Sequence, residues 1–319
     1  MSEVDDWKTV SSAMATEDPV FVVGVARSGT TALRNTIERL EAFRPTGGDS
    51  PETRVFLRPF ALLDLLDSND RRFHRFLLGD DDEAAALLER LRVLDADIGP
   101  LRRALAQMIG DGGRFARARW RLLGWHHAVR LFFHHARRAR GTRRIFEKTP
   151  AHLRHLPEVH LTFPRMRAVC MFRHPVDVYS SYRKRLAASE KKGIDEAKIG
   201  WLRISPRKFW KRYADLYANY ELAREQRPES VMLLTYEQLT GAPEESLRAV
   251  CEFIGEPFDR ANLLEAPEER RDAHGSPKPS SRLVANRKDW REWLSEEEAS
   301  KIEAHLPNEM RRLGFEARC

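Results

Sequence analysis

The chain has 319 residues, of which 42% are hydrophobic and 32% charged. This balance is typical of a globular protein and excludes a largely disordered chain. Lys and Arg outnumber Asp and Glu by 55 to 48, and the formal net charge of +7 favours anionic ligands. No stretch approaches the roughly 20 apolar residues that span a bilayer. The three cysteines form no CxxC pair, which argues against a zinc site or a disulfide framework and predicts a reducing, cytoplasmic location.

The first residues, 1–18, are acidic and polar and lack the basic flank and apolar core of a signal peptide. We expect them to form a tail-like leader. The apolar, β-branched run Val20 to Val25 then predicts a buried parallel strand, and the spacing of Leu33, Ile37 and Leu40 predicts a helix over residues 30–40.

Apolar runs and helical patterns continue to alternate along the rest of the chain. Further strands are predicted at 145–146, 167–172 and 231–235. Further helices are predicted at 61–66, 83–94, 114–140, 176–186, 206–226 and 246–253. Pro175 suits a first helical position, and Ser295 with Glu298 predicts a capping box at the last helix.

Strands that alternate with helices indicate an α/β fold with a central, mainly parallel sheet flanked by helices. We find no internal repeat and no interdomain linker, so residues 19–319 are predicted to form a single domain. Within it we expect a helical insert at about 54–144 and a basic lid at about 273–294, which begins in a loop rich in Pro, Ser and Gly. The aromatic residues of the insert suit the walls of a ligand pocket, although aromatic residues at helical spacing are more often part of a core.

The loop after the first strand, GVARSGTT from Gly24 to Thr31, has the glycine spacing of a phosphate-binding P-loop. Glycines let successive N–H groups face inward, and the following helix adds its positive end. The central sheet is therefore expected to be P-loop-like. Thr30 stands where a nucleotide triphosphatase needs its lysine, whereas Arg27 supplies a cation two residues before Gly29. This loop favours an anion site other than that of a kinase.

Three later segments of the sequence carry further motifs. Arg173 follows the strand 167–172, and Ser181 comes eight residues later in the next helix. The other two segments are FEKTP at 146–150 and LTYEQL at 234–239. Together with the loop at Arg27, they resemble the sulfotransferases that use 3′-phosphoadenosine 5′-phosphosulfate (PAPS), of the bacterial type. The string SPETR at 50–54 is similar to the tyrosylprotein branch.

The resemblance implies a nucleotide site and no metal. The phosphosulfate would be held by the loop and by Lys148, and the 3′-phosphate by Arg173 and Ser181. Arg27 and Lys148 would also act in catalysis. The full set of implied cofactor-binding residues is Arg27, Ser28, Gly29, Thr30, Thr31, Arg173, Ser181, Tyr236, Arg287 and Lys288.

The resemblance also implies an acceptor side. Glu52 would be the general base, Arg54 would orient it or contact the acceptor, and His152 would lie beside the acceptor. A histidine is the competing base, and residues 126–135 carry four of them.

The expected activity is in-line transfer of a sulfuryl group from PAPS to a hydroxyl of a small molecule or peptide. A P-loop kinase is one alternative, opposed by Thr30 and by the lack of a clear Walker-B aspartate. A noncatalytic nucleic-acid-binding protein is another, suggested by the Arg- and His-rich stretch 114–144. For a sulfotransferase we expect no nucleic-acid partner and no membrane span. The sequence leaves the acceptor and the oligomeric state open.

Overall fold

A computed structural model gives the fold and describes residues 6–45, 53, 55–57, 107, 124–265, 283 and 289–319. Four parallel strands form one sheet in the order β2-β1-β3-β4. Their bounds are Val20–Gly24 for β1, Phe146–Lys148 for β2, Arg167–Phe172 for β3 and Val231–Thr235 for β4. The predicted α/β class with a central parallel sheet flanked by helices is confirmed.

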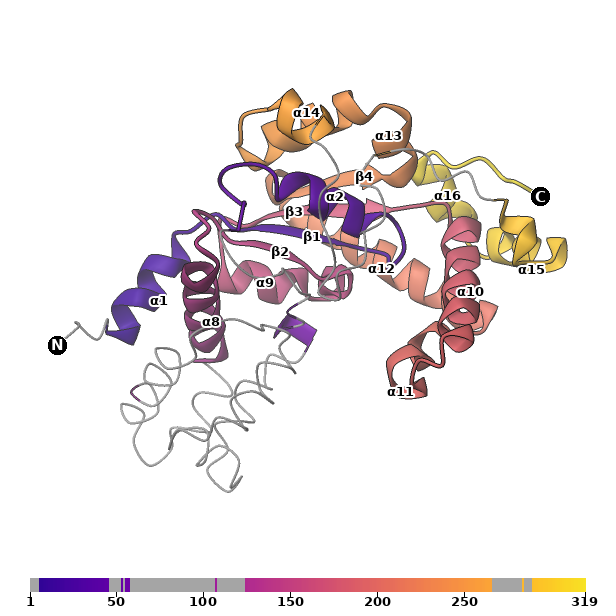
Figure 1. Cartoon of the computed structure of the whole chain (residues 1–319), viewed down its shortest axis with the longest axis horizontal. Coiled ribbons are helices and arrows are strands. Elements are labelled where there is room, and N and C mark those ends of the chain that lie inside the picture. Colours follow the sequence, from indigo (N-terminus) through magenta and orange to yellow (C-terminus); the bar gives the residue numbers. More distant parts are fainter. Residues whose placement is uncertain are drawn as a thin grey trace, which may run out of the picture.

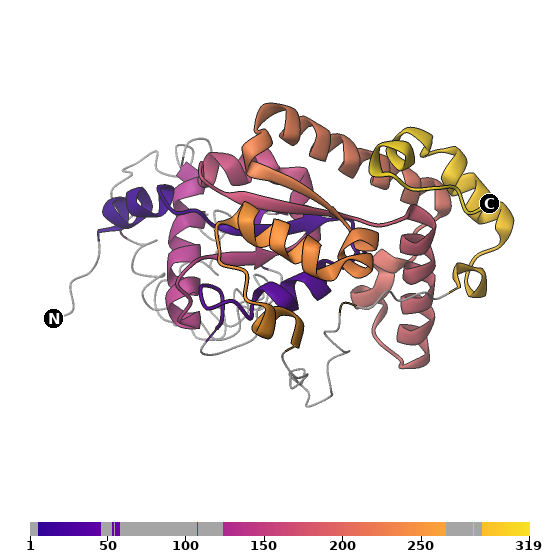
Figure 2. The ribbon, with the colours of Figure 1, turned by 90° about the horizontal axis from the view of Figure 1, so that it is seen from above.

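Helices cover both faces of this sheet (Figures 1 and 2). Helices α2, α13 and α14 lie on one face, and α8, α9 and α12 lie on the other, while α10, α15 and α16 gather beyond the carboxyl ends of the strands. The helices are α1 (Trp7–Ala15), α2 (Thr30–Ile37), α8 (Trp125–Arg140), α9 (Leu156–Thr162), α10 (Pro175–Lys191), α11 (Glu196–Ile199), α12 (Pro206–Gln226), α13 (Tyr236–Gly241), α14 (Pro243–Ile254), α15 (Glu296–Ala304) and α16 (Pro307–Leu313).

Short helical turns join these elements. They are the 3-10 turns η1 (Val55–Leu57), η4 (Pro150–His155), η5 (Gly200–Leu202), η6 (Pro228–Ser230) and η8 (Trp290–Glu292), and the π-helical turn η7 (Ala261–Glu265). No helix in the described ranges is both long and apolar enough to cross a bilayer.

The two faces of the sheet bury two separate hydrophobic clusters. In β1, Phe21 and Val23 point to the cluster that contains α8 and α12, whereas Val20 and Val22 point to the cluster that contains α2 and α14. Successive side chains of a strand alternate between faces, so burial on both sides requires an uninterrupted apolar run. This requirement explains why β1 and β3 carry almost no polar residue.

The element boundaries differ modestly from the predicted ones. Helix α2 ends at Ile37 rather than at 40, and α10 extends to Lys191 rather than to 186. Helix α14 begins at Pro243, three residues before its predicted start, because proline is well suited to a first helical position. Pro175 does open α10, and the capping box of Ser295 and Glu298 is present.

The expected tail-like leader is corrected for residues 7–15, which form helix α1. Trp7, Val10 and Met14 are buried, because their spacing places them on one side of a helix. That side packs on α8, where the Ser11 hydroxyl lies 2.7 Å from His127 Nδ1. The acidic composition of the segment concealed this apolar stripe.

Most of the expected insert, 54–144, and most of the expected lid, 273–294, lie outside the described residues. Of the insert, the structure describes η1, residue 107 and the stretch from Gly124 onward, which includes α8. Of the lid, it describes Leu283 and residues 289–294, where Trp290 is buried.

Gly24 is expected to be irreplaceable for stability. Its φ is +139°, and a Cβ there would lie 2.1 Å from the Met171 carbonyl oxygen. We expect Gly24→Ala to lower the free energy of unfolding by about 2 to 4 kcal/mol, measured by denaturant titration. Gly241→Ala is the matched control, since a Cβ at Gly241 meets nothing within 4 Å. Equal stability of the two variants would contradict this prediction.

Candidate anion-binding active site

The loop between β1 and α2 is shaped by backbone conformations that few residues adopt. Gly29 has a φ of +94° at the N-cap of α2, and Arg27 has a φ of +73°, a left-handed conformation that is uncommon outside glycine. Such strain is typically retained at functional sites. The first N–H groups of a helix lack intrahelical acceptors, so the start of α2 directs donors and a partial positive charge into the loop.

Ser28 has a structural role in this loop. Its buried hydroxyl lies 2.6 Å from the Val25 carbonyl oxygen and 3.0 Å from that of Met171, and its own N–H donates to Val25. The Ser28 hydroxyl and N–H are therefore engaged in closing the loop. In this loop the Ser28 N–H is therefore occupied within the protein.

Arg27 joins the loop to α10. Its Nε donates to the Ser181 hydroxyl over 3.1 Å, although the two residues are 154 positions apart in sequence. The sequence prediction placed Arg27 at one phosphate and Ser181 at another. The structure brings the two side chains into direct contact.

Tyr236 links Arg173 to the loop. The Arg173 guanidinium lies 4.2 Å from the centre of the Tyr236 ring, and a Cβ at Gly29 would lie 2.7 Å from the Tyr236 Cδ2. The ring therefore packs against the loop on one side and supports the guanidinium on the other. The buried Arg173 Nε has no hydrogen-bond partner among the described residues, which leaves a donor for an anion.

Three arginines gather at this place, and we call Arg27, Arg173 and Arg185 the arginine cluster. The pKa of Arg27 is lowered below its ordinary value, first by desolvation and then by the positive charges of Arg185 and Arg173. Mutual repulsion of this kind is relieved when an anion binds between the cations. Arg185 was not predicted from the sequence, although it lies four residues after Ser181 and therefore on the same side of α10.

Lys148 ends the edge strand β2, where it pairs in register with Val22. It is buried, and alternation along the strand places it on the face that α2 covers. The predicted phosphosulfate lysine thus lies on the same side of the sheet as the helix that begins at the loop.

Glu147, the residue before Lys148, organises the opposite face. Its Oε1 accepts hydrogen bonds from the Thr53 N–H and hydroxyl, both over 3.1 Å, and from the Thr149 hydroxyl over 2.5 Å. Its Oε2 lies 3.0 Å from His152 Nδ1. Every residue of this network is buried. The carboxylate therefore fixes the chain at Thr53 against β2.

The prediction that His152 contacts an acceptor is corrected. The ring has no exposed surface, and its Nε2 accepts the Phe56 N–H over 3.3 Å while Nδ1 faces Glu147. Both ring nitrogens are thus engaged within the protein. His152 is instead a positioning residue for the segment from Thr53 to Phe56.

The histidines proposed as alternative bases lie on α8. His127 contacts Ser11 and the Trp7 ring, which assigns it to the packing of α1 on α8. Burial and the neighbouring His127 lower the pKa of His126 to about 4, so its ring is neutral at physiological pH. Glu52 and Arg54, and the lid residues Arg287 and Lys288, lie outside the described residues.

Comparison with known proteins identifies the fold and its family. A family model described as the sulfotransferase family matches residues 19–260. The chain belongs to the sulfotransferase family. A search of curated proteins gave no match. The part of this sulfotransferase that matches contains all four strands and the complete arginine cluster.

Solved sulfotransferases share the fold at low sequence identity. Sulfotransferase STF9 from Mycobacterium avium is 17% identical with a TM-score of 0.51, and the match covers 96% of this chain and 79% of that one. The sulfotransferase domain from the curacin biosynthetic pathway is 17% identical with a TM-score of 0.51, and the match covers 94% of this chain and 98% of that one. The sulfotransferase domain of the Synechococcus PCC 7002 olefin synthase is 18% identical with a TM-score of 0.50, and the match covers 91% of this chain and 96% of that one.

The Glu147 network should stabilise this sulfotransferase in a pH-dependent manner. Burial alone would raise the pKa of Glu147, but the electrostatic and hydrogen-bond interactions with His152, and the hydrogen bonds from Thr149 and Thr53, lower it below its ordinary value. A lowered pKa stabilises the folded state above the ordinary glutamate pKa, and this stabilisation is lost as the pH falls. We expect Glu147→Gln to lower the free energy of unfolding near neutral pH by about 1 to 3 kcal/mol.

Denaturant titrations from neutral to acidic pH check this expectation. The difference between wild type and Glu147→Gln should shrink as the pH falls below the ordinary glutamate pKa towards the lowered pKa of Glu147. Glu225→Gln, a change at an exposed position of α12, is the control and should match wild type throughout. A pH-independent deficit for Glu147→Gln would show that the carboxylate charge is not responsible.

Proposed function

We propose that this sulfotransferase transfers a sulfuryl group from PAPS to a hydroxyl acceptor by in-line displacement. The observation that carries the proposal is the arginine cluster beside a glycine-shaped loop that lacks a P-loop lysine. A ligand with anionic groups at two separate places matches this distribution of charge. PAPS has such groups at its 5′ and 3′ positions.

The residues present fit such a ligand. Gly24 and Gly29 leave no room for a Cβ, because Met171 and Tyr236 pack against them, so close packing fixes the course of the loop. Arg173 Nε has no hydrogen-bond partner among the described residues, and the guanidinium lies 4.2 Å from the centre of the Tyr236 ring. A planar guanidinium suits the oxygens of a phosphate. We assign the 3′-phosphate to Arg173 and Ser181 and the 5′-phosphosulfate to the loop.

PAPS, when bound, would supply the sulfuryl group. The role of this chain's residues would be positioning and neutralisation of charge, as in phosphoryl transfer. The N–H groups at the start of α2, with Arg27 and Lys148, would stabilise negative charge that develops between the transferred group and the departing phosphate. In the ranges that the structure describes, no three metal-ligating side chains gather.

The acceptor hydroxyl requires a group that removes its proton, and we propose Glu52 for this role with Arg54 orienting it. Support comes from the sequence SPETR and from Thr53, the next residue, which is anchored on Glu147. A histidine is the second candidate. We further propose that Arg287 and Lys288 contact the nucleotide from the lid, that the acceptor is a small molecule or a peptide, and that the protein works in the cytoplasm.

Calorimetric titration separates this function from its alternatives. The wild-type protein should bind adenosine 3′,5′-bisphosphate (PAP) without metal and more tightly than ATP. Arg173→Ala should weaken PAP binding about tenfold or more, because it removes a charged partner of the phosphate. Arg207→Ala, at an exposed position of α12, should bind PAP like wild type. A preference for ATP with magnesium would favour a kinase, and binding that falls steeply with salt and ignores PAP would favour a nucleic-acid-binding protein.

The proposed base can be tested separately once an acceptor has been found by screening hydroxyl compounds with labelled PAPS. Glu52→Ala should leave the dissociation constant of PAP unchanged and lower kcat by about 100-fold or more, as expected for loss of a general base. An equal loss in PAP affinity would instead place Glu52 in nucleotide binding, and an unchanged kcat would favour a histidine.

A further inference from the structure

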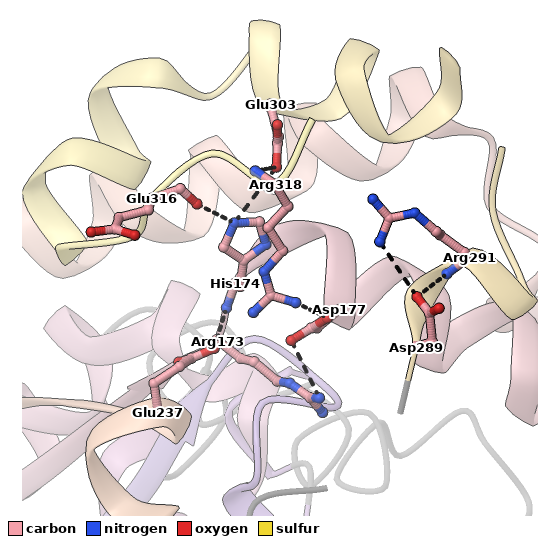
Figure 3. Close-up of polar contacts among 9 residues, drawn as sticks. All are labelled: Arg173, His174, Asp177, Glu237, Asp289, Arg291, Glu303, Glu316 and Arg318. Carbon is pink, nitrogen blue, oxygen red and sulfur yellow. Dashed lines mark hydrogen bonds and ion pairs between the residues drawn. The ribbon is translucent and has the colours of Figure 1, made fainter. Parts of the chain in front are cut away.

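Two arginines from distant parts of the chain share the Asp177 carboxylate. Arg173 Nη2 lies 3.5 Å from Asp177 Oδ2, and Arg318 donates from Nη1 to Asp177 Oδ1 (Figure 3). The side chains of Arg173 and Asp177 are only 13% and 11% exposed. Water therefore screens the charges of this triplet only partly.

The segment 315–319, which carries Arg318, is held in place by contacts that do not involve its guanidinium. Glu303 of α15 accepts the Arg318 N–H over 2.9 Å and the Cys319 N–H over 3.3 Å. The His174 Nε2 lies 3.1 Å from the Glu316 carbonyl oxygen. Phe315 packs on the His174 ring with centroids 5.5 Å apart. Removal of the Arg318 side chain should therefore leave the segment docked.

Asp177 would oppose anion binding if nothing compensated its charge. A carboxylate 3.5 Å from Arg173 attracts the same guanidinium that a phosphate needs, and it repels the phosphate itself. Arg318 supplies a second cation to that carboxylate from the side opposite to Arg173 (Figure 3). The triplet then carries a net charge of one positive unit, and Arg173 keeps its Nε without a partner among the described residues.

We propose that Arg318 is a positioning residue for the donor nucleotide: it neutralises Asp177 and thereby leaves Arg173 available to the 3′-phosphate. The identity of the phosphate rests on the proposed function, whereas the competition between the two arginines rests on the contacts above. The residue touches Asp177 and acts on the ligand through Arg173.

The test measures PAP binding by calorimetry on the full-length protein. Arg318→Ala should raise the dissociation constant of PAP about three- to tenfold, the range expected for a partly screened pair of charges. Arg318→Lys, which keeps the charge, should recover most of the affinity. Arg312→Ala removes a charge from the same end of the chain, where Arg312 pairs with Glu221, and should leave PAP affinity unchanged.

A double-mutant cycle with Asp177→Asn identifies the route by which Arg318 acts. In the Asp177→Asn background, Arg318→Ala should change PAP affinity less than twofold, because no carboxylate remains to be neutralised. A loss as large as in the wild-type background would overturn the proposal, as would an unchanged affinity in Arg318→Ala alone. If wild type itself fails to bind PAP, the proposed function fails first, and thermal melting of each variant shows whether it is folded.

Discussion

The site depends on one carbonyl group, that of Met171 in the central strand β3. It accepts the Val25 N–H over 3.0 Å and lies 3.0 Å from the Ser28 hydroxyl, and it leaves no space for a Cβ at Gly24. These three constraints fix the turn by which the chain leaves β1. Because β3 ends directly before Arg173, the same strand sets both the shape of the loop and the position of the Arg173 guanidinium.

Electrostatic cost is concentrated where the ligand would bind. Arg27 lies near two other arginines, which is unfavourable without an anion, and its left-handed backbone conformation adds steric strain. The protein compensates locally through the ring of Tyr236, which supports Arg173, and through Asp177. The folded protein is therefore less stable than it would be without these charges, but the site is positively charged before any ligand binds, as in other preorganised centres.

Sequence reasoning succeeded where local chemistry and tertiary structure agree. The strand at Val20, the loop to Thr31 and the strand before Arg173 could be placed because buried parallel strands require continuous apolar runs. It failed where a residue's role depends on distant partners. Glu147 looked like a neighbour of a functional lysine, and only the fold shows that its carboxylate holds Thr53 and His152. Helix α1 was missed because only Trp7, Val10 and Met14 supply large apolar side chains to its buried side, within an acidic and polar segment.

The contact between Phe56 and Trp125 joins the two ends of a long stretch of chain. The two rings lie 6.4 Å apart and nearly perpendicular, although 69 positions separate them in the sequence. The chain therefore departs after η1 and returns at α8 through adjacent points that belong to one buried cluster. Closing a long excursion at such a junction costs little additional entropy as its length changes. The stability of the cluster that holds the two ends therefore constrains the length of the stretch between them only weakly.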